Sequence, residues 1–115
     1  MAEFTGPLAR AFARLQQATA WVAQQGLKDP EEPAAAASDY LGLFALVAVG
    51  WMWARMAQAA LAKLDGMQAD DPGAAFYRAK LAAARFFMAR ALPEANTRFT
   101  VLMAGKASVM GIEIA

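Results

Sequence analysis

The sequence predicts an all-α protein, an antiparallel helical bundle of three long helices plus a short fourth, in a single domain over residues 1–115. Hydrophobic residues make up 59% of the chain and charged residues 18%, so a core is easily filled and apolar surface is left over. Ala and Leu dominate, and runs of Val, Ile and Thr are nearly absent, which favours helix over sheet. Apolar residues also recur at helical spacing between Pro- and Gly-containing linkers.

The first helix is expected over residues 7–25. Pro7 suits the first turn, where its missing N–H has no helical partner to lose. Thr5 or Gly6 is placed to cap this helix, and Gly26 is a natural stop. The segment 27–33 contains two prolines and three acidic residues, so we expect an extended, exposed linker there.

The second helix is expected over residues 34–64, with an uncharged stretch at 40–54. This stretch is apolar nearly all round, which is typical of a central buried helix. Gly42 and Gly50 are interpreted as points where a neighbouring backbone comes close. A membrane span needs about 20 apolar residues, and a longer run here would place Arg55 in the bilayer. We therefore favour a buried helix over a transmembrane one.

The third helix is expected over residues 73–92 and the short fourth over 93–104. Asp-Asp-Pro-Gly at the end of the linker 65–73 is a helix start signal. Pro93 either kinks one continuous helix or opens a new one, and Glu94 favours the new start. The apolar tail 109–115 is expected to be loose or docked on a neighbour.

The residue types present exclude most catalytic sites. The chain has no Cys and no His, so it has no disulfide, thiol nucleophile, imidazole base or Cys/His zinc site. The acidic clusters in 29–32 and 65–71 do not match a calcium loop, and no phosphate-binding glycine motif is present. We expect no catalytic residue, no cofactor-binding residue and no metal ligand in this chain.

Charge is unevenly distributed along the chain. Residues 73–106 carry six basic residues and one acid, a net charge of +5, whereas the rest carries five basic and nine acidic residues, a net charge of −4. A basic face can bind nucleic acid, be balanced by the acidic linkers, or dock on another part of a larger protein. No nucleic-acid recognition motif accompanies it, so we expect no nucleic-acid partner.

Four aromatic residues lie on segments that are expected to face one another. Core packing is the simpler interpretation, and an interface is the alternative, because Trp is enriched at interface hot spots. The candidate packing or interface residues are Trp51, Trp53, Phe86 and Phe87.

Several stretches resemble the C-terminal helical domain of bacterial acyl-CoA dehydrogenases, the acetyl-CoA-dehydrogenase-like C-terminal domain, in the branch that includes 3-methylmercaptopropionyl-CoA dehydrogenases. The resemblance covers about residues 8–106 and consists of helix-packing patterns rather than catalytic motifs. It is carried by Leu15–Trp21, Asp39–Phe44, Gly50–Ala57, Phe76–Phe87, Leu92–Glu94 and Ala104–Gly105.

The resemblance implies a parent enzyme of fatty acid metabolism that uses FAD to form a 2,3-double bond in an acyl-CoA. In that family the glutamate base and the flavin and CoA sites lie upstream of this domain, and none maps onto a position here. We therefore expect a C-terminal fragment of a larger enzyme that is not catalytic in isolation. Its expected partners are the dehydrogenase body, a second subunit, or both. A stand-alone oligomerisation or binding module is the alternative. The chain has no secretory signal at its start, so we expect a cytoplasmic protein with no membrane partner.

Overall fold

The computed structural model describes residues 1–106, and every regular element over this range is helical. The elements are α1 (Ala2–Lys28), α2 (Glu31–Asp65), α3 (Pro72–Phe86), a π-helical turn η1 (Phe87–Ala91) and α4 (Glu94–Leu102). The predicted all-α class, with three long helices and a short fourth, is confirmed. The tail 109–115 lies outside the described residues.

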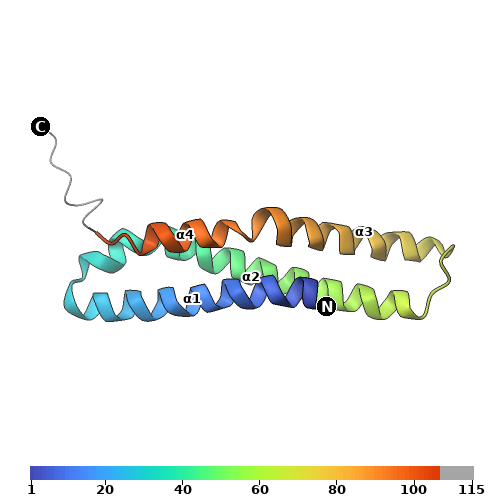
Figure 1. Cartoon of the computed structure of the whole chain (residues 1–115), viewed down its shortest axis with the longest axis horizontal. Coiled ribbons are helices and arrows are strands. Elements are labelled where there is room, and N and C mark those ends of the chain that lie inside the picture. Colours follow the sequence, from blue (N-terminus) through green and yellow to red (C-terminus); the bar gives the residue numbers. More distant parts are fainter. Residues whose placement is uncertain (107–115) are drawn as a thin grey trace, which may run out of the picture.

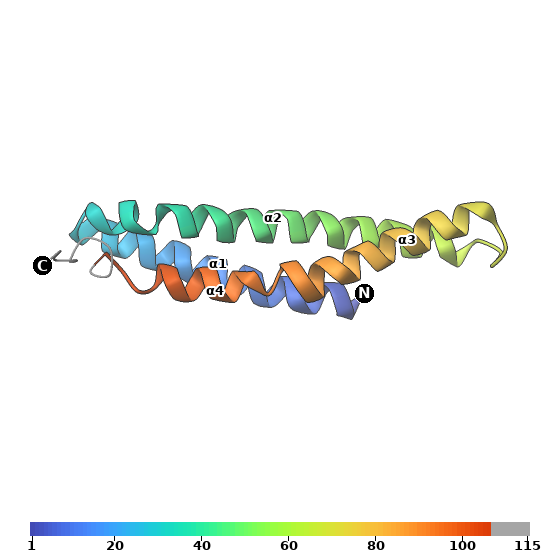
Figure 2. The same ribbon diagram turned by 90° about the horizontal axis from the view of Figure 1, so that it is seen from above.

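The helices form a long, thin molecule of 66 × 29 × 16 Å. The helices α1 and α4 lie side by side on one flank of α2 (Figure 1), and α3 crosses α2 near its C-terminal end (Figure 2). Because α1 begins well short of one end of the molecule, only α2 and α3 extend past its N-terminus (Figure 1). Over the part of α2 that precedes this crossing, the other helices cover one flank only.

The core that joins these helices is built largely from alanine. Phe4, Leu43 and Leu102 are the largest fully buried side chains. Most of the others are small, so neighbouring helices approach closely and bury little apolar area per residue. The buried alanines are Ala11, Ala18, Ala36, Ala54, Ala57, Ala60, Ala74, Ala84 and Ala95.

The helix α1 is longer at both ends than the predicted 7–25. It begins before Pro7 because Phe4 is completely buried and its N–H bonds to the carbonyl of Met1 at 2.9 Å. Burial of this ring outweighs the proline start signal. Gly26 does not stop the helix either. A Cβ at Gly26 would lie 2.8 Å from the Pro33 ring, so this glycine permits close approach of α2.

The predicted extended linker 27–33 is wrong, because only Asp29 and Pro30 separate α1 from α2. Glu31, Glu32 and Pro33 form the first turn of α2 instead. Acidic side chains are favourable at a helix N-terminus, and proline is tolerated in the first turn. Asp29 supports this start by accepting a hydrogen bond from the N–H of Glu31 at 3.0 Å.

The third helical segment ends as a bend rather than a clean break. The predicted start at Asp71–Gly73 is confirmed, because the Asp71 carboxylate accepts the Gly73 N–H at 2.8 Å. The expected helix 73–92 is α-helical only to Phe86 and then passes into η1, whose last bond joins the Leu92 N–H to the Phe87 carbonyl. Pro93 cannot continue a helix, so α4 begins at Glu94 as a separate element.

Gly42 and Gly50 do lie at close contacts, but with side chains rather than with a neighbouring backbone. A Cβ at Gly42 would be 3.2 Å from Nε of Arg98. A Cβ at Gly50 would be 3.3–3.4 Å from Leu8, Leu92 and Phe87. Gly50 therefore leaves room where α1, α2 and η1 meet.

Candidate functional site

The most unusual surface of the molecule is the uncovered side of α2. Leu41 is 68% exposed and Met52 57% exposed, and Ala45 and Ala48 between them are exposed too. No charged residue occurs from Tyr40 to Ala54. Large exposed apolar patches on soluble proteins mark interaction sites. We call the side of α2 that carries these residues the outward face.

This exposure corrects the expectation that α2 is buried all round. Only 22% of its most apolar 18-residue window, with a mean hydropathy of 1.5, is buried. By length and composition α2 is sufficient to cross a membrane, but core helices of soluble proteins meet the same criterion. The surplus of apolar residues thus lies on the outer side of a helix whose inner side packs normally.

An apolar groove of about 520 Å³ runs beside the outward face, between α1 and α2. Phe12 of α1 and Phe44 and Trp51 of α2 are each about half exposed along it. The only polar residue that lines the groove is Thr5, so the surface fits an apolar partner rather than a charged ligand. The groove is lined by Thr5, Leu8, Ala9, Phe12, Leu15, Phe44, Val47, Ala48 and Trp51.

The structure divides the four predicted aromatic residues into two kinds. Trp53 and Phe87 are partly buried and pack against the core. Trp51 is 52% exposed and Phe86 65% exposed, so neither is a core residue. Trp51 lines the groove, and its ring lies 5.0 Å from the guanidinium carbon of Arg55. Sequence reasoning missed Phe12, Phe44, Leu41 and Met52.

Half of the basic residues in 73–106 are paired with acidic residues from the first part of the chain. Arg85 donates two hydrogen bonds of 3.1 Å to Glu3, and Arg98 contacts Asp39 at 3.3 Å. The bond from Arg85 lowers the pKa of the Glu3 carboxyl below its ordinary value. Of the three interpretations offered for the basic bias, this pairing supports balancing by the acidic N-terminal part.

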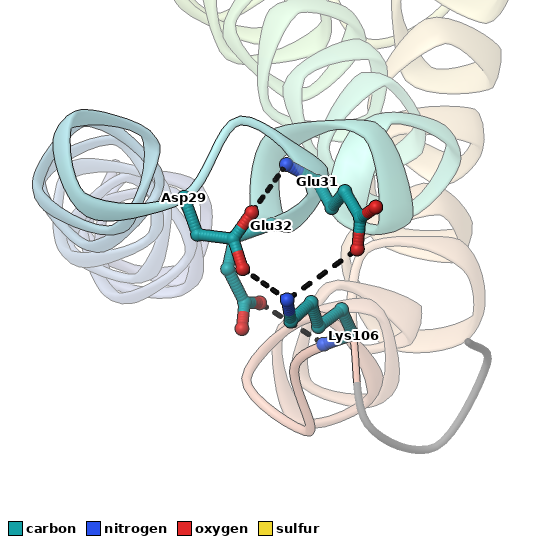
Figure 3. A network of polar contacts seen from close by, with 4 residues as sticks. All are labelled: Asp29, Glu31, Glu32 and Lys106. Atoms are coloured by element: carbon teal, nitrogen blue, oxygen red, sulfur yellow. Dashed lines mark hydrogen bonds and ion pairs between the residues drawn. The ribbon is translucent and has the colours of Figure 1, made fainter. Parts of the chain in front are cut away.

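Lys106 ties the end of α4 to the α1–α2 turn (Figure 3). Its ammonium contacts Asp29 and also Glu31 at 3.4 Å, and its backbone N–H donates to Glu32 at 3.0 Å. The hydrogen bond to Lys106 lowers the pKa of Asp29, and the same bond raises the pKa of Lys106. The predicted acidic linker thus functions as an anchor for the C-terminal end of the bundle.

Within residues 1–106 no group of three or more His, Cys, Asp or Glu side chains is placed to hold a metal, and no polar side chain is buried. A flavin dinucleotide needs donors for its pyrophosphate and for the polar edge of its ring. The groove, with Thr5 alone, does not fit such a group. The prediction that this chain has no catalytic residue stays a prediction.

The fold and the surface define a class, a small all-α domain whose apolar side is suited to another protein. The chain belongs to the family described as acetyl-CoA dehydrogenase C-terminal like, whose family model matches residues 1–113. The predicted resemblance is thereby confirmed at the level of the family, and the chain is a C-terminal domain of the acyl-CoA dehydrogenase-like enzymes. A search of curated proteins gave no match.

Proposed function

We propose that this chain is the C-terminal covering and assembly domain of an FAD-dependent acyl-CoA dehydrogenase that forms a 2,3-double bond in its substrate. The flavin and the base that removes the α-proton belong to the catalytic body of that enzyme. The domain contributes the apolar groove between α1 and α2, into which an apolar segment of the body docks. The site of action is the cytoplasm.

The observation that carries this proposal is the groove itself. Three half-exposed aromatic side chains line it, and aromatic residues buried at an interface are its usual energetic anchors. Its volume of about 520 Å³ is large enough for several side chains of a partner helix or loop. The family match supports a dehydrogenase body as the partner, because the family is described as acetyl-CoA dehydrogenase C-terminal like.

The test uses the enzyme in which this chain follows a dehydrogenase body in the same reading frame. Acyl-CoA-dependent reduction of an electron-accepting dye is measured, together with the flavin content of the purified protein. We expect activity in the joined protein and none in the isolated 115-residue chain. A joined protein that binds no flavin and reduces no dye contradicts the proposal.

The groove is tested by a matched pair of substitutions on α1. Phe12→Asp places a carboxylate in the groove, whereas Ala20→Asp places one at an exposed position outside the groove lining. A separately expressed body is titrated with each chain. We expect Phe12→Asp to weaken binding by about 100-fold or more, the usual loss at an interface hot spot, and Ala20→Asp to bind like the unaltered chain.

A stand-alone oligomerisation module is the second candidate function. The observation that favours it is the outward face of α2, which is apolar whether or not a dehydrogenase body is present. It predicts self-association of the isolated chain and no binding to any dehydrogenase body. The titration above separates the two functions.

A further inference from the structure

The outward face of α2 carries a heptad seam that extends along nearly the whole helix. Alternating steps of three and four residues, a period of 3.5, connect ten positions from Glu31 to Ala62, and all ten are exposed. Such a period keeps one side of a helix in contact with a second helix. The seam consists of Glu31, Ala34, Ser38, Leu41, Ala45, Ala48, Met52, Arg55, Ala59 and Ala62.

The seam matches a second copy of itself that runs in the opposite direction. Leu41 and Met52 lie at equal distances from the midpoint of the seam, as do Ala45 and Ala48. When two α2 helices run antiparallel about that midpoint, Leu41 meets Met52 and Ala45 meets Ala48. Large residues then oppose large ones and small residues oppose small ones. A two-fold interface requires this kind of self-complementary surface.

Polar residues at the ends of the seam favour the same antiparallel register. Arg55 lies opposite Ser38 of the second copy, whose hydroxyl is an acceptor for the guanidinium. Lys63, next to the last seam position, lies near Glu31 of the second copy. Neither Arg55 nor Lys63 takes part in an ion pair within residues 1–106. A parallel pairing would instead place Arg55 next to Arg55 of the second copy and Lys63 next to Lys63 of the second copy, so that like charges would repel.

The central part of the seam, from Ser38 to Arg55, is exposed at every position. The helices α1 and α4 lie on the opposite flank of α2, and α3 crosses α2 only near its C-terminal end (Figure 2). The alanines at the centre of the seam allow two helices to approach to about 8 Å between axes, the close end of the normal range. We propose that two copies of this chain dimerise through α2, antiparallel and about a two-fold axis at the midpoint of the seam.

This dimer rests on the proposed assembly role and specifies its subunit contact. Ala48 belongs to both the seam and the groove lining, whereas Ala45 is exposed on the seam and lies outside the groove lining. The first experiment is therefore sedimentation equilibrium of the isolated chain and of Ala45→Glu. We expect a dimer for the chain. We expect Ala45→Glu to raise the dissociation constant by about 100-fold or more, because two like charges are buried without partners. Ala79→Glu, at an exposed position of α3, is the matched control and should leave the dimer intact.

The second experiment tests the register, which the absence of cysteine makes straightforward. In the proposed dimer two copies of residue 41 are eleven residues apart along the seam, about 16 Å. A cross-linker shorter than that distance should therefore join Leu41→Cys to Met52→Cys in a mixed sample. It should join neither variant to itself. Circular dichroism of every variant checks that the helices are retained.

Three outcomes overturn the dimer. These are a monomer at all concentrations, self-cross-linking of Leu41→Cys, and association only with phospholipid vesicles in place of a second copy. None of them affects the titration of the dehydrogenase body with Phe12→Asp. A monomer that still binds the body leaves the proposed function intact and removes only the α2 pairing. A dimer that binds no dehydrogenase body leaves the α2 pairing intact and contradicts the proposed function.

Discussion

The two faces of α2 have similar composition and opposite surroundings. Leu43 on the inner face is completely buried, whereas Leu41, two residues earlier, is 68% exposed. Both belong to the same uncharged stretch, and hydropathy does not distinguish them. The difference arises from the arrangement of the other helices, because α1 and α4 both pack on one flank of α2 (Figure 2). Apolar composition therefore reports how much surface a helix can bury, but not whether its own chain buries it.

The largest expected effect comes from truncating each leucine in turn. Leu43→Ala should lower the free energy of unfolding by about 2–5 kcal/mol, because it leaves a cavity in the core. Leu41→Ala should change the free energy of unfolding of the monomer by less than about 0.5 kcal/mol, since the side chain is already in water. Urea unfolding of dilute protein measures both. Equal losses for the two variants would show that the outward face is covered within the monomer.

A smaller effect is expected where α2 meets α1 and η1. Gly50→Val should lower the free energy of unfolding by about 1–3 kcal/mol, because the added atoms press on Leu8, Leu92 and Phe87. Gly66→Ala is the control, since nothing lies within 4 Å of the added Cβ. Thermal unfolding followed by circular dichroism compares them. If the free energy of unfolding of Gly50→Val were unchanged, the inner face of α2 would lie further from Leu8, Leu92 and Phe87 than the structure shows.

The smallest effect is the pH dependence of two ion pairs, Asp29–Lys106 at the α1–α2 turn and Glu3–Arg85 between α1 and α3. The folded-state pKa of Asp29 lies below its ordinary value of 3.8, and that of Glu3 below 4.5, chiefly through the hydrogen bonds from Lys106 and Arg85. A lowered carboxyl pKa gives stability that is present above the ordinary value and lost as the pH falls through the folded-state value.

Lys106→Met should therefore reduce stability at pH 7 slightly and flatten the decline of stability below about pH 4. Urea midpoints between pH 7 and pH 2 measure this decline. Lys80→Met is the control, because Lys80 takes part in no ion pair within the described residues. An identical acid decline for Lys106→Met and the unaltered chain would contradict the assigned pKa shift of Asp29.

Most of the fold follows from the sequence, because apolar spacing and the helix start at Asp71 are local signals. The start of α1 does not follow, since it depends on burial of Phe4 by helices far along the chain. The role of Gly26 does not follow either. It was predicted to stop the first helix, but it lies inside α1 and allows the close approach of Pro33, which is a tertiary contact. Local signals mark helix ends only where tertiary packing does not outweigh them.

The candidate site is harder to predict from the sequence than the fold is. Trp51 was identified as a packing or interface residue, and it lines the groove, but its exposure depends on which flank of α2 the other helices occupy. Phe44 lies in the stretch 40–54, which was interpreted as part of a buried helix. The alternating steps of three and four residues from Glu31 to Ala62 are visible in the sequence. An apolar helix offers several such stripes, however, and only the fold shows which one is exposed.

Hydroxyl-radical footprinting measures whether the outward face and the groove of this domain are covered in the assembled enzyme. Oxidation of Trp51 and Met52 is compared between the dilute isolated chain and the intact dehydrogenase, with the buried Met88 as the internal reference. We expect rapid oxidation of Trp51 and Met52 in the isolated chain and strong protection of both in the intact enzyme, while Met88 stays protected in both samples. Equal oxidation of Trp51 and Met52 in the two samples would show that the assembled enzyme leaves the outward face and the groove uncovered.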